Sequence, residues 1–415
     1  MVPVSIAARF ERRERTADEM VEMIDGALPR LQANALGEEK AGRLCDDTIK
    51  TLDEIGVFRM SSPREYGGLA FSTEEQGRVY TSVGKIAGST GWVSWVTTTH
   101  GRWIAMFSKK AQDEVYGMDW MGPRISGVLA PHGPGQARRV DGGFMLSGRW
   151  PFCSGCRHTA WSILGSMCQM PDGQSDMIMP LVCTADVEIL DDWAVSGMKG
   201  TGSNTVQIKE ELFVPNYRVL RMKDANAGRW ASTPPVGQVL FLNNFIDYTT
   251  ITSGSTPLGM AKGALDYYRE RLEKRGIIGT DYKVQADAPV AHLQLAEAIS
   301  RIDAAERLLS ADCNELDRRA AAGEPSDDLF QTKIKFDVSS SVRGCCEAIE
   351  ILHRGSGAST IHEANPMQRY ARDIRVATVH GHLNYETCAE NYGRALAGKP
   401  LFGSFSNLEK QIPVG

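Results

Sequence analysis

Three short segments of the sequence carry side chains that could take part in catalysis. Cys153 and Cys156 enclose Ser154, and a histidine pair, His380 and His382, is separated by a single glycine. His100 ends a segment rich in tryptophan and threonine that begins at position 92. An imidazole titrates near neutral pH and can pass a proton, so these histidines are candidates for acid–base chemistry.

The two cysteines form a C-x-x-C motif, a spacing that elsewhere binds zinc or serves redox chemistry. A zinc site would need a second pair of ligands nearby, and only His158 is close in the sequence. The nine cysteines are scattered and odd in number, so we expect no disulfide framework. The simpler interpretation is that Cys153 and Cys156 are small side chains in a tight pocket.

Several common enzyme signatures are absent from the sequence. It contains no G-x-x-x-x-G-K-[ST] loop and no strand followed by G-x-G-x-x-G, which excludes a typical nicotinamide-binding unit. Neither H-E-x-x-H nor G-x-S-x-G occurs, so zinc peptidases and α/β-hydrolases are also disfavoured. Residues 200–202 and 355–357 are G-x-G triplets that are too short to indicate a nucleotide site.

The composition is that of a globular protein. The chain has 415 residues, 42% of them hydrophobic and 23% charged, and a net charge of −5 without a long basic run. Nucleic acid and anionic membrane surfaces are therefore not expected as partners. No apolar stretch reaches the roughly 20 residues of a membrane-spanning helix, and residues 1–15 lack the apolar core of a signal peptide. We expect a cytoplasmic protein.

The candidate residues fall on three regions of different texture. Residues 1–121 read as helices, with capping boxes at Thr16 and Ser72, each followed three residues later by glutamate. Residues 122–228 alternate short β-branched and aromatic runs with turn signals at 141–143 and 171–173, which predicts an antiparallel β unit, either a small barrel or a sandwich. Residues 229–415 contain long apolar stripes at helical spacing, which predicts a helical bundle.

This order of helical, β and helical regions resembles the acyl-CoA dehydrogenase superfamily. Three segments carry the resemblance: LSGRWPFCSG at 146–155, SGMKGTGSN at 196–204 and PMQRYARD at 366–373. The resemblance implies an α+β multidomain fold with an N-terminal α domain, a middle antiparallel β barrel and a C-terminal four-helix bundle. It also implies a homotetramer.

Two branches of the superfamily differ after the Arg372-Asp373 pair. Dehydrogenases usually place a catalytic glutamate eight residues after such a pair, whereas this chain has Gly381 there, preceded by His380. Together with the W-x-F-x-S-G pattern at 150–155, this resembles the two-component flavin monooxygenases. That branch includes the oxygenase components of p-hydroxyphenylacetate hydroxylase and of a steroid-ring phenol hydroxylase.

The resemblance implies a definite chemistry. The oxygenase would receive reduced FMN or FAD from a separate NAD(P)H:flavin reductase, which explains why it lacks a nicotinamide motif of its own. Reduced flavin and O₂ would give a C4a-hydroperoxide, whose distal oxygen hydroxylates a small, phenol-like aromatic substrate. The protein would have to exclude water and protonate the leaving oxygen.

Three residues take catalytic roles by this resemblance. Ser154 would approach flavin N5, and His380 would lie near C4a and deliver a proton. His100 would hold the phenol oxygen of the substrate. His380 and His382 fall in the final helical segment, where His382 points about 200° around the helix from His380, so we expect only His380 to face the pocket.

Other residues are expected around the cofactor. Trp92 and Phe152 would wall the ring system, with Cys153 beside them, and Gly381 would leave room next to the ring. A strand formed by Ser126, Gly127 and Val128 would meet the flavin through its backbone. Arg275, with a planar guanidinium suited to phosphate, would reach the cofactor of a neighbouring subunit, and Gly357 and Ala358 would form a loop over that cofactor.

Three alternatives stay open on the sequence alone. The same oxidant could oxygenate nitrogen or sulfur in a non-phenolic substrate. Some dehydrogenases carry their base on another helix, so acyl-CoA dehydrogenation also stays open. The third alternative is a non-catalytic protein of the same fold with a role in assembly.

Overall fold

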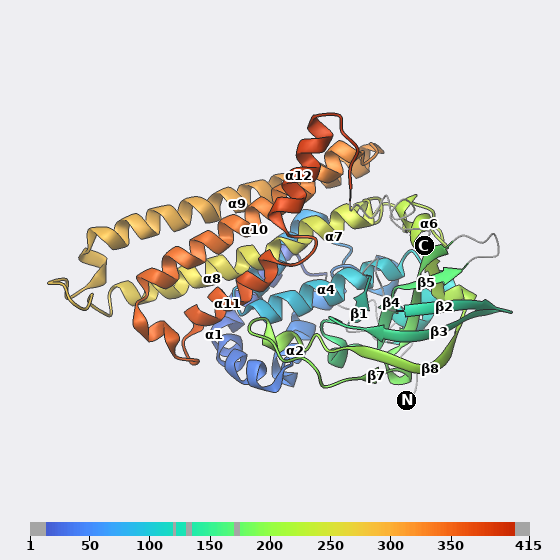
Figure 1. Cartoon of the computed structure of the whole chain (residues 1–415), viewed down its shortest axis with the longest axis horizontal. Helices are drawn as coiled ribbons and strands as arrows, with labels where there is room; N and C mark the ends of the chain where they lie inside the picture. Colours follow the sequence, from blue (N-terminus) through green and yellow to red (C-terminus); the bar gives the residue numbers. More distant parts are fainter. Residues whose placement is uncertain (1–13, 119–121, 130–134, 170–174, 403–415) are drawn as a thin grey trace.

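The computed structural model describes residues 14–118, 122–129, 135–169 and 175–402, and the N-terminal segment used for the signal-peptide prediction lies mostly outside these ranges. Figure 1 shows a body of long helices with a β-sheet packed at one end. Within the described part of the chain, no helix is long and apolar enough to cross a membrane.

Five helices form the N-terminal region. The side chains of Thr16 and Ser72 each accept a hydrogen bond from the backbone N–H of the glutamate three residues on. Each glutamate carboxylate accepts a bond from the backbone N–H of the cap residue, so the two predicted capping boxes are confirmed. The first helix, α1, ends at Gly42, whose left-handed backbone (φ +62°) closes the last turn. The helices are α1 (Ala17–Ala41), α2 (Asp46–Ile55), α3 (Thr73–Gly84), α4 (Gly88–Ile104) and α5 (Lys109–Met118).

The strands form one open, mixed sheet. Its order is β1-β4-β6-β5-β2-β3-β8-β7, with β9 pairing to β6, so the path has two ends and does not close. The strands are β1 (Ile125–Val128), β2 (Gly135–Val140), β3 (Gly143–Trp150), β4 (Trp161–Leu164), β5 (Ser166–Gln169), β6 (Ser175–Cys183), β7 (Glu188–Ile189), β8 (Val206–Pro215) and β9 (Val219–Arg221).

The expectation of an antiparallel barrel is therefore wrong. The turn at 141–143 does join β2 and β3 as a hairpin, with Val140 opposite Gly143, and the turn at 171–173 lies outside the described residues. Turn signals in a sequence indicate only pairs of strands that one turn joins directly. The pairings β1–β4 and β2–β5 are parallel and join strands distant in the sequence, so no local turn could reveal them.

The C-terminal region is built from long helices. Helices α8, α9, α10 and α11 pack against one another, but α3 also packs on α8 and α9, so a single hydrophobic core runs through both helical regions. The boundaries at 121/122 and 228/229 and a separate four-helix bundle accordingly stay predictions. The helices are α6 (Met222–Asn226), α7 (Phe245–Ser253), α8 (Ser255–Leu272), α9 (Pro289–Ala322), α10 (Asp328–Gly355), α11 (Pro366–Thr378) and α12 (Tyr385–Leu396).

Helix α4 connects the sheet to the helical body. It lies between them in Figure 1 and contacts strand β1, helix α11 and the short helix η6 (Lys199–Thr201). Nearly all of its side chains are buried, including six serines and threonines and His100. A buried helix of this polarity is costly unless its polar groups have partners, which directs attention to the surfaces that it touches.

Candidate active site

One face of α4 carries Val93, Thr97 and His100, which are four and three residues apart and therefore lie in one row. The turn that contains Ser154 packs on this face. A methyl group built on Gly155 would lie 3.1 Å from the side chains of both Val93 and Thr97, which is tighter than ordinary van der Waals contact, so the turn packs closely on α4.

The turn itself has an unusual backbone. Phe152 has a left-handed conformation (φ +62°), which is uncommon for a residue with a side chain, and Gly155 has φ +71°. Backbone hydrogen bonds hold both sides of Ser154, from Cys153 N to Asn204 O (3.2 Å) and from Gly155 N to Thr201 O (2.9 Å). The segments 146–155 and 196–204 that carried the family resemblance thus form one structural unit.

Ser154 ends a row of buried hydroxyl groups. Its Oγ lies 2.7 Å from Ser203 Oγ, which lies 2.7 Å from Thr201 Oγ1. Thr201 Oγ1 donates to the carbonyl oxygen of Met198 at 2.7 Å. The sequence offered one signal for this row, the serine and threonine within segment 196–204, but gave no reason to pair them with Ser154.

His100 is buried against strand β1. Its Nδ1 lies 3.3 Å from the carbonyl oxygen of Ile125, and a methyl group built on Gly127 would lie 3.0 Å from the imidazole ring. Burial lowers the pKa of His100 to about 4, so the ring is neutral at pH 7. Because a carbonyl oxygen can only accept, Nδ1 carries the proton and Nε2 is an acceptor.

The remaining residues of that strand are well anchored. Ser126 Oγ lies 2.6 Å from Ser162 Oγ and 2.9 Å from Thr159 Oγ1, and Val128 belongs to the hydrophobic cluster under the sheet. Of this strand, the structure places Gly127 and the carbonyl of Ile125 against His100, whereas the side chains of Ser126 and Val128 have other neighbours.

The second histidine candidate lies on the other side of α4. The rings of His380 and Trp92 are 5.1 Å apart and meet edge to face, and Trp92 in turn contacts Trp95. Helix α11 ends at Thr378, so His380 and His382 stand in the turn before α12 and not on a helix. Their rings are 5.5 Å apart, and the expectation that His382 points away was wrong because helical periodicity does not apply to a turn.

The charge state of His380 also differs from the expectation of near-neutral titration. Burial lowers the pKa of His380 to about 4 and that of His382 to about 3, so both rings are neutral at pH 7. The backbone N–H of His382 donates to Nδ1 of His380 at 3.4 Å. The proton of the neutral His380 ring is then on Nε2, which makes that nitrogen a hydrogen-bond donor. A Cβ built on Gly381 would meet no atom of the described residues within 4 Å.

Arg275, Gly357 and Ala358 form a separate cluster. They follow the ends of α8 and α10, at the opposite end of the molecule from the sheet (Figure 1). Arg275 Nη1 donates to the carbonyl oxygen of Ser356 at 2.6 Å, and Gly357 (φ +70°) leaves the space that the guanidinium occupies. Within one chain these residues cannot be part of the region around α4.

Two features beside Ser154 test whether a flavin ring fits there. Phe152 is 70% exposed, although it stands in an ordered turn next to Trp193, with ring centroids 5.8 Å apart. The amide Nδ2 of Asn204 is buried and has no hydrogen-bond partner among the residues that the structure describes. A flat ring system with polar edges would cover the aromatic side chain and offer acceptors to the amide, so the residues present fit a flavin.

The thiols of Cys153 and Cys156 are buried at this turn. Among the described residues, no group of three histidine, cysteine, aspartate or glutamate side chains is placed to hold a metal ion. A hydrogen bond with Cys156, together with burial, raises the pKa of Cys153, and the same bond lowers the pKa of Cys156. Both residues are buried as free thiols, which agrees with the interpretation that they are small residues in a tight pocket.

The profiles of two acyl-CoA dehydrogenase domains match the chain, the N-terminal domain over residues 13–119 and the C-terminal domain over residues 251–385. The chain is 35% identical over 389 residues to the "Flavin-dependent monooxygenase, oxygenase subunit HsaA" of Rhodococcus jostii, covering 92% of this chain and 99% of that protein. This chain belongs to the flavin-dependent monooxygenase family. It is also 29% identical to the "p-hydroxyphenylacetate 3-hydroxylase, oxygenase component" of Acinetobacter baumannii, over 91% of this chain and 89% of that protein.

Solved structures agree with this assignment. The HsaA monooxygenase from M. tuberculosis superimposes with a TM-score of 0.86 at 31% identity, covering 94% of this chain and all of that chain (100%). XiaF from Streptomyces sp., solved in complex with FADH2 and glycerol, gives a TM-score of 0.85 at 28% identity over 94% and 97% of the two chains. The monooxygenase is thus the oxygenase component of a two-component system and not an acyl-CoA dehydrogenase.

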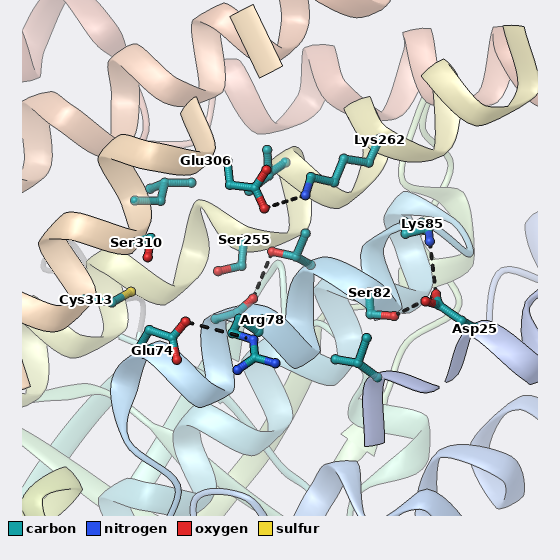
Figure 2. A pocket seen from close by; sticks show the side chains of 15 residues that line it. Asp25, Glu74, Arg78, Ser82, Lys85, Ser255, Lys262, Glu306, Ser310 and Cys313 are labelled. Atoms are coloured by element: carbon teal, nitrogen blue, oxygen red, sulfur yellow. Dashed lines mark hydrogen bonds and ion pairs between the residues drawn. The ribbon is translucent and has the colours of Figure 1, made fainter. Parts of the chain in front are cut away.

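The monooxygenase also has a hollow of about 350 Å³ away from α4, between helices α1, α3, α8 and α9. Figure 2 shows that the charged side chains around it pair with one another. Lys262 pairs with Glu306, and Lys85 bonds Asp25 at 3.0 Å. Since these charges are already compensated, the hollow offers no group prepared for a ligand.

Proposed function

We propose that this monooxygenase hydroxylates a small phenol, using O₂ and reduced FMN or FAD that a separate NAD(P)H:flavin reductase supplies. The Acinetobacter relative is named for a substrate that carries a phenol, and the Streptomyces structure contains FADH2. The observation that carries the proposal is the state of His100.

A neutral imidazole with a fixed tautomer suits a phenol. Nδ1 of His100 is committed to the carbonyl of Ile125, so Nε2 is left as an acceptor for a phenol O–H. Accepting that hydrogen bond shifts electron density from the oxygen into the aromatic ring, which favours attack of the ring on an electrophilic oxygen. A thioether or a tertiary amine has no proton to offer to Nε2, so oxygenation of either would leave the buried acceptor unused.

The flavin ring would be held by Ser154, Phe152 and Trp92. Cys153 would be buried in the same turn, and one side of the ring would be lined by Ser126, Gly127 and Val128. When bound, reduced flavin supplies the two electrons that activate O₂. The role of Ser154 would be to hold the N5 position of the ring, where retention of a proton prevents early release of hydrogen peroxide. The buried surroundings of the serine strengthen such a bond, because water cannot compete for it.

His380 would assist the reaction with oxygen as a donor. Its Nε2–H group, next to Trp92, can stabilise negative charge that develops on oxygen. This differs from the role of a charged imidazolium, because burial keeps the ring neutral at working pH. Gly381 would leave the room beside the ring that oxygen requires.

The distal cluster would complete the site of a second subunit. Arg275, Gly357 and Ala358 lie too far from the sheet to serve the same ring, so we place them at the phosphate-bearing end of a flavin bound to a neighbouring chain. This requires at least a dimer and supports the homotetramer expected from the family resemblance. Free thiols throughout the described chain fit a reducing, cytoplasmic location.

An anaerobic experiment tests the proposal. The protein is mixed with reduced FMN or FAD and a panel of phenols, thioethers and amines, and oxygen is then admitted. We expect a ring-hydroxylated product from a phenol, and no oxidation of NADH by the protein alone.

A matched pair of variants ties this outcome to His100. His100→Phe removes the acceptor and should weaken phenol binding about tenfold, the value of one hydrogen bond in a buried site. His100→Gln keeps an acceptor oxygen and should retain part of the affinity. Oxygenation of a thioether or amine but of no phenol, or equal phenol binding by His100→Phe and the unmodified protein, would overturn the proposal.

A further inference from the structure

The hydroxyl groups of Thr201, Ser203 and Ser154 form a directed chain. Three contacts of 2.7 Å run from the carbonyl oxygen of Met198 through Thr201 and Ser203 to Ser154. Two oxygen atoms approach this closely only when a hydrogen lies between them. Each hydroxyl group supplies one hydrogen, so three contacts use the three hydrogens available.

The carbonyl end decides the direction. Met198 O can only accept, so Thr201 donates to it, and Thr201 then accepts from Ser203. By the same logic Ser203 accepts from Ser154. The single proton of Ser154 is thereby committed to Ser203, and the Ser154 oxygen can act toward any further group only as an acceptor.

The carbonyl that starts the chain is itself fixed. The backbone N–H of Met198 donates to Asp373 Oδ1 at 2.6 Å, and Met198 has a left-handed backbone (φ +53°). The carbonyl also accepts the backbone N–H of Thr201 at 3.1 Å. Asp373 is fully buried in α11, so the direction of the chain is set by packed structure and not by solvent.

We infer that this chain makes the site selective for the redox state of the flavin, because an acceptor at Ser154 suits a ring that presents N5–H and rejects one that presents a bare N5 lone pair. Reduced flavin has a hydrogen on N5, and oxidised flavin has none. The inference rests on the proposed function only in placing N5 of the flavin at Ser154. Thr201 and Ser203 are positioning residues that act through Ser154.

The test measures the dissociation constants of oxidised and anaerobically reduced flavin for the same protein. The unmodified protein should bind reduced flavin more tightly. In Ser203→Ala the proton of Ser154 is released from its partner and can turn toward N5. Oxidised flavin should then bind about tenfold more tightly, whereas reduced flavin should not gain, and the selectivity falls by that factor.

Two further variants separate direction from mere packing. Thr201→Val lets Ser203 turn and donate to Ser154, so it should lower the selectivity in the same way, whereas Thr201→Ser preserves the chain and should keep the selectivity. In Ser154→Ala the selectivity should also fall, but in this variant because reduced flavin binds more weakly and not because oxidised flavin binds more tightly. Thermal denaturation checks that each variant is folded.

The outcomes distinguish the two proposals. If the unmodified protein binds neither form of flavin, the proposed function fails. If it prefers reduced flavin and Ser203→Ala leaves the ratio unchanged, or weakens both forms equally, the directed chain is refuted while the proposed function stands. Tighter binding of the oxidised form by Ser203→Ala and Thr201→Val, but not by Thr201→Ser, supports the chain.

Discussion

The two sides of helix α4 hold their candidate catalytic side chains in different ways. Toward the sheet, hydrogen bonds orient the two candidate residues, His100 through Ile125 O and Ser154 through Ser203. Toward α11 and the turn that follows it, aromatic packing dominates, and His380 lies against Trp92 with one weak backbone hydrogen bond of 3.4 Å. Hydrogen bonds fix direction on the first side, and burial fixes charge on the second.

This difference predicts which substitutions should change the selectivity and coupling of the site without a general loss of packing. On the sheet side, removal of one hydroxyl group changes the orientation of the next, so small changes should alter selectivity and coupling. On the aromatic side, no partner imposes such an order, so a substitution should act mainly by opening space and by admitting water. The predictions below test this contrast, beginning with the largest effect.

Ser154→Ala should have the largest effect. Loss of a hydrogen bond in a buried site is worth about 1–3 kcal/mol, which corresponds to roughly a tenfold to hundredfold change in the rate of the side reaction. We expect hydrogen peroxide in place of hydroxylated product, measured as the ratio of the two per oxidised flavin. An unchanged ratio in a folded variant would remove Ser154 from the mechanism.

His380→Ala should slow the reaction of bound reduced flavin with oxygen by about tenfold, because it removes the Nε2 donor. His382→Ala should do less, since the backbone of His382, and not its ring, donates to His380. Stopped-flow mixing with oxygen gives both rates. The pKa of His380 is about 4, so the rate in the unmodified protein should be flat from pH 6 to pH 8, and a step near neutral pH would contradict a neutral donor.

The aromatic side should also make the fold sensitive to acid. His380 and His382 have folded pKa values of about 4 and about 3, whereas the unfolded value is about 6.5. As the pH falls below about 6.5, the unfolded chain takes up protons that the folded chain refuses, so stability is present above that pH and is lost toward pH 4. Between pH 7 and pH 5, the two histidines together should lower the free energy of unfolding by roughly 2–4 kcal/mol.

Urea unfolding of the double variant His380→Gln/His382→Gln measures that loss, as the difference in its pH dependence from the unmodified protein. The comparison with the unmodified protein is needed because Asp373 changes the free energy of unfolding in the opposite direction as the pH falls. Burial raises the pKa of Asp373 to about 7, so its contribution weakens as the pH rises from about 4 to about 7. Parallel pH profiles for the variant and the unmodified protein would show that folding does not lower the pKa of the two histidines.

The smallest effect is expected at the distal cluster, which belongs to neither side of α4. Gly357→Ala places a Cβ 2.8 Å from Arg275 Nη2 and forces alanine to φ +70°, at a cost of about 1–2 kcal/mol. Gly323→Ala has a similar φ of +68° but open space, so it reports the backbone strain without the clash. Thermal unfolding should rank Gly357→Ala below Gly323→Ala, and addition of Arg275→Ala should close the gap.

The sequence by itself determined the family and the residue types of the site. The segments 146–155, 196–204 and 366–373 carried the resemblance, and Gly381 in place of a glutamate favoured a monooxygenase over a dehydrogenase. The capping boxes at Thr16 and Ser72 were also predictable, because a cap depends only on residues within one turn of a helix.

Tertiary structure decided the rest, because the remaining contacts join residues distant in the sequence. The parallel strand pairs that leave the sheet open have no local signal. The neutral charge of His380 comes from burial by elements that close around it, and the position of the His382 ring comes from a turn that periodicity cannot describe. The direction of the Ser154 hydroxyl depends on Ser203, which lies 49 positions away, so only the folded chain could reveal it.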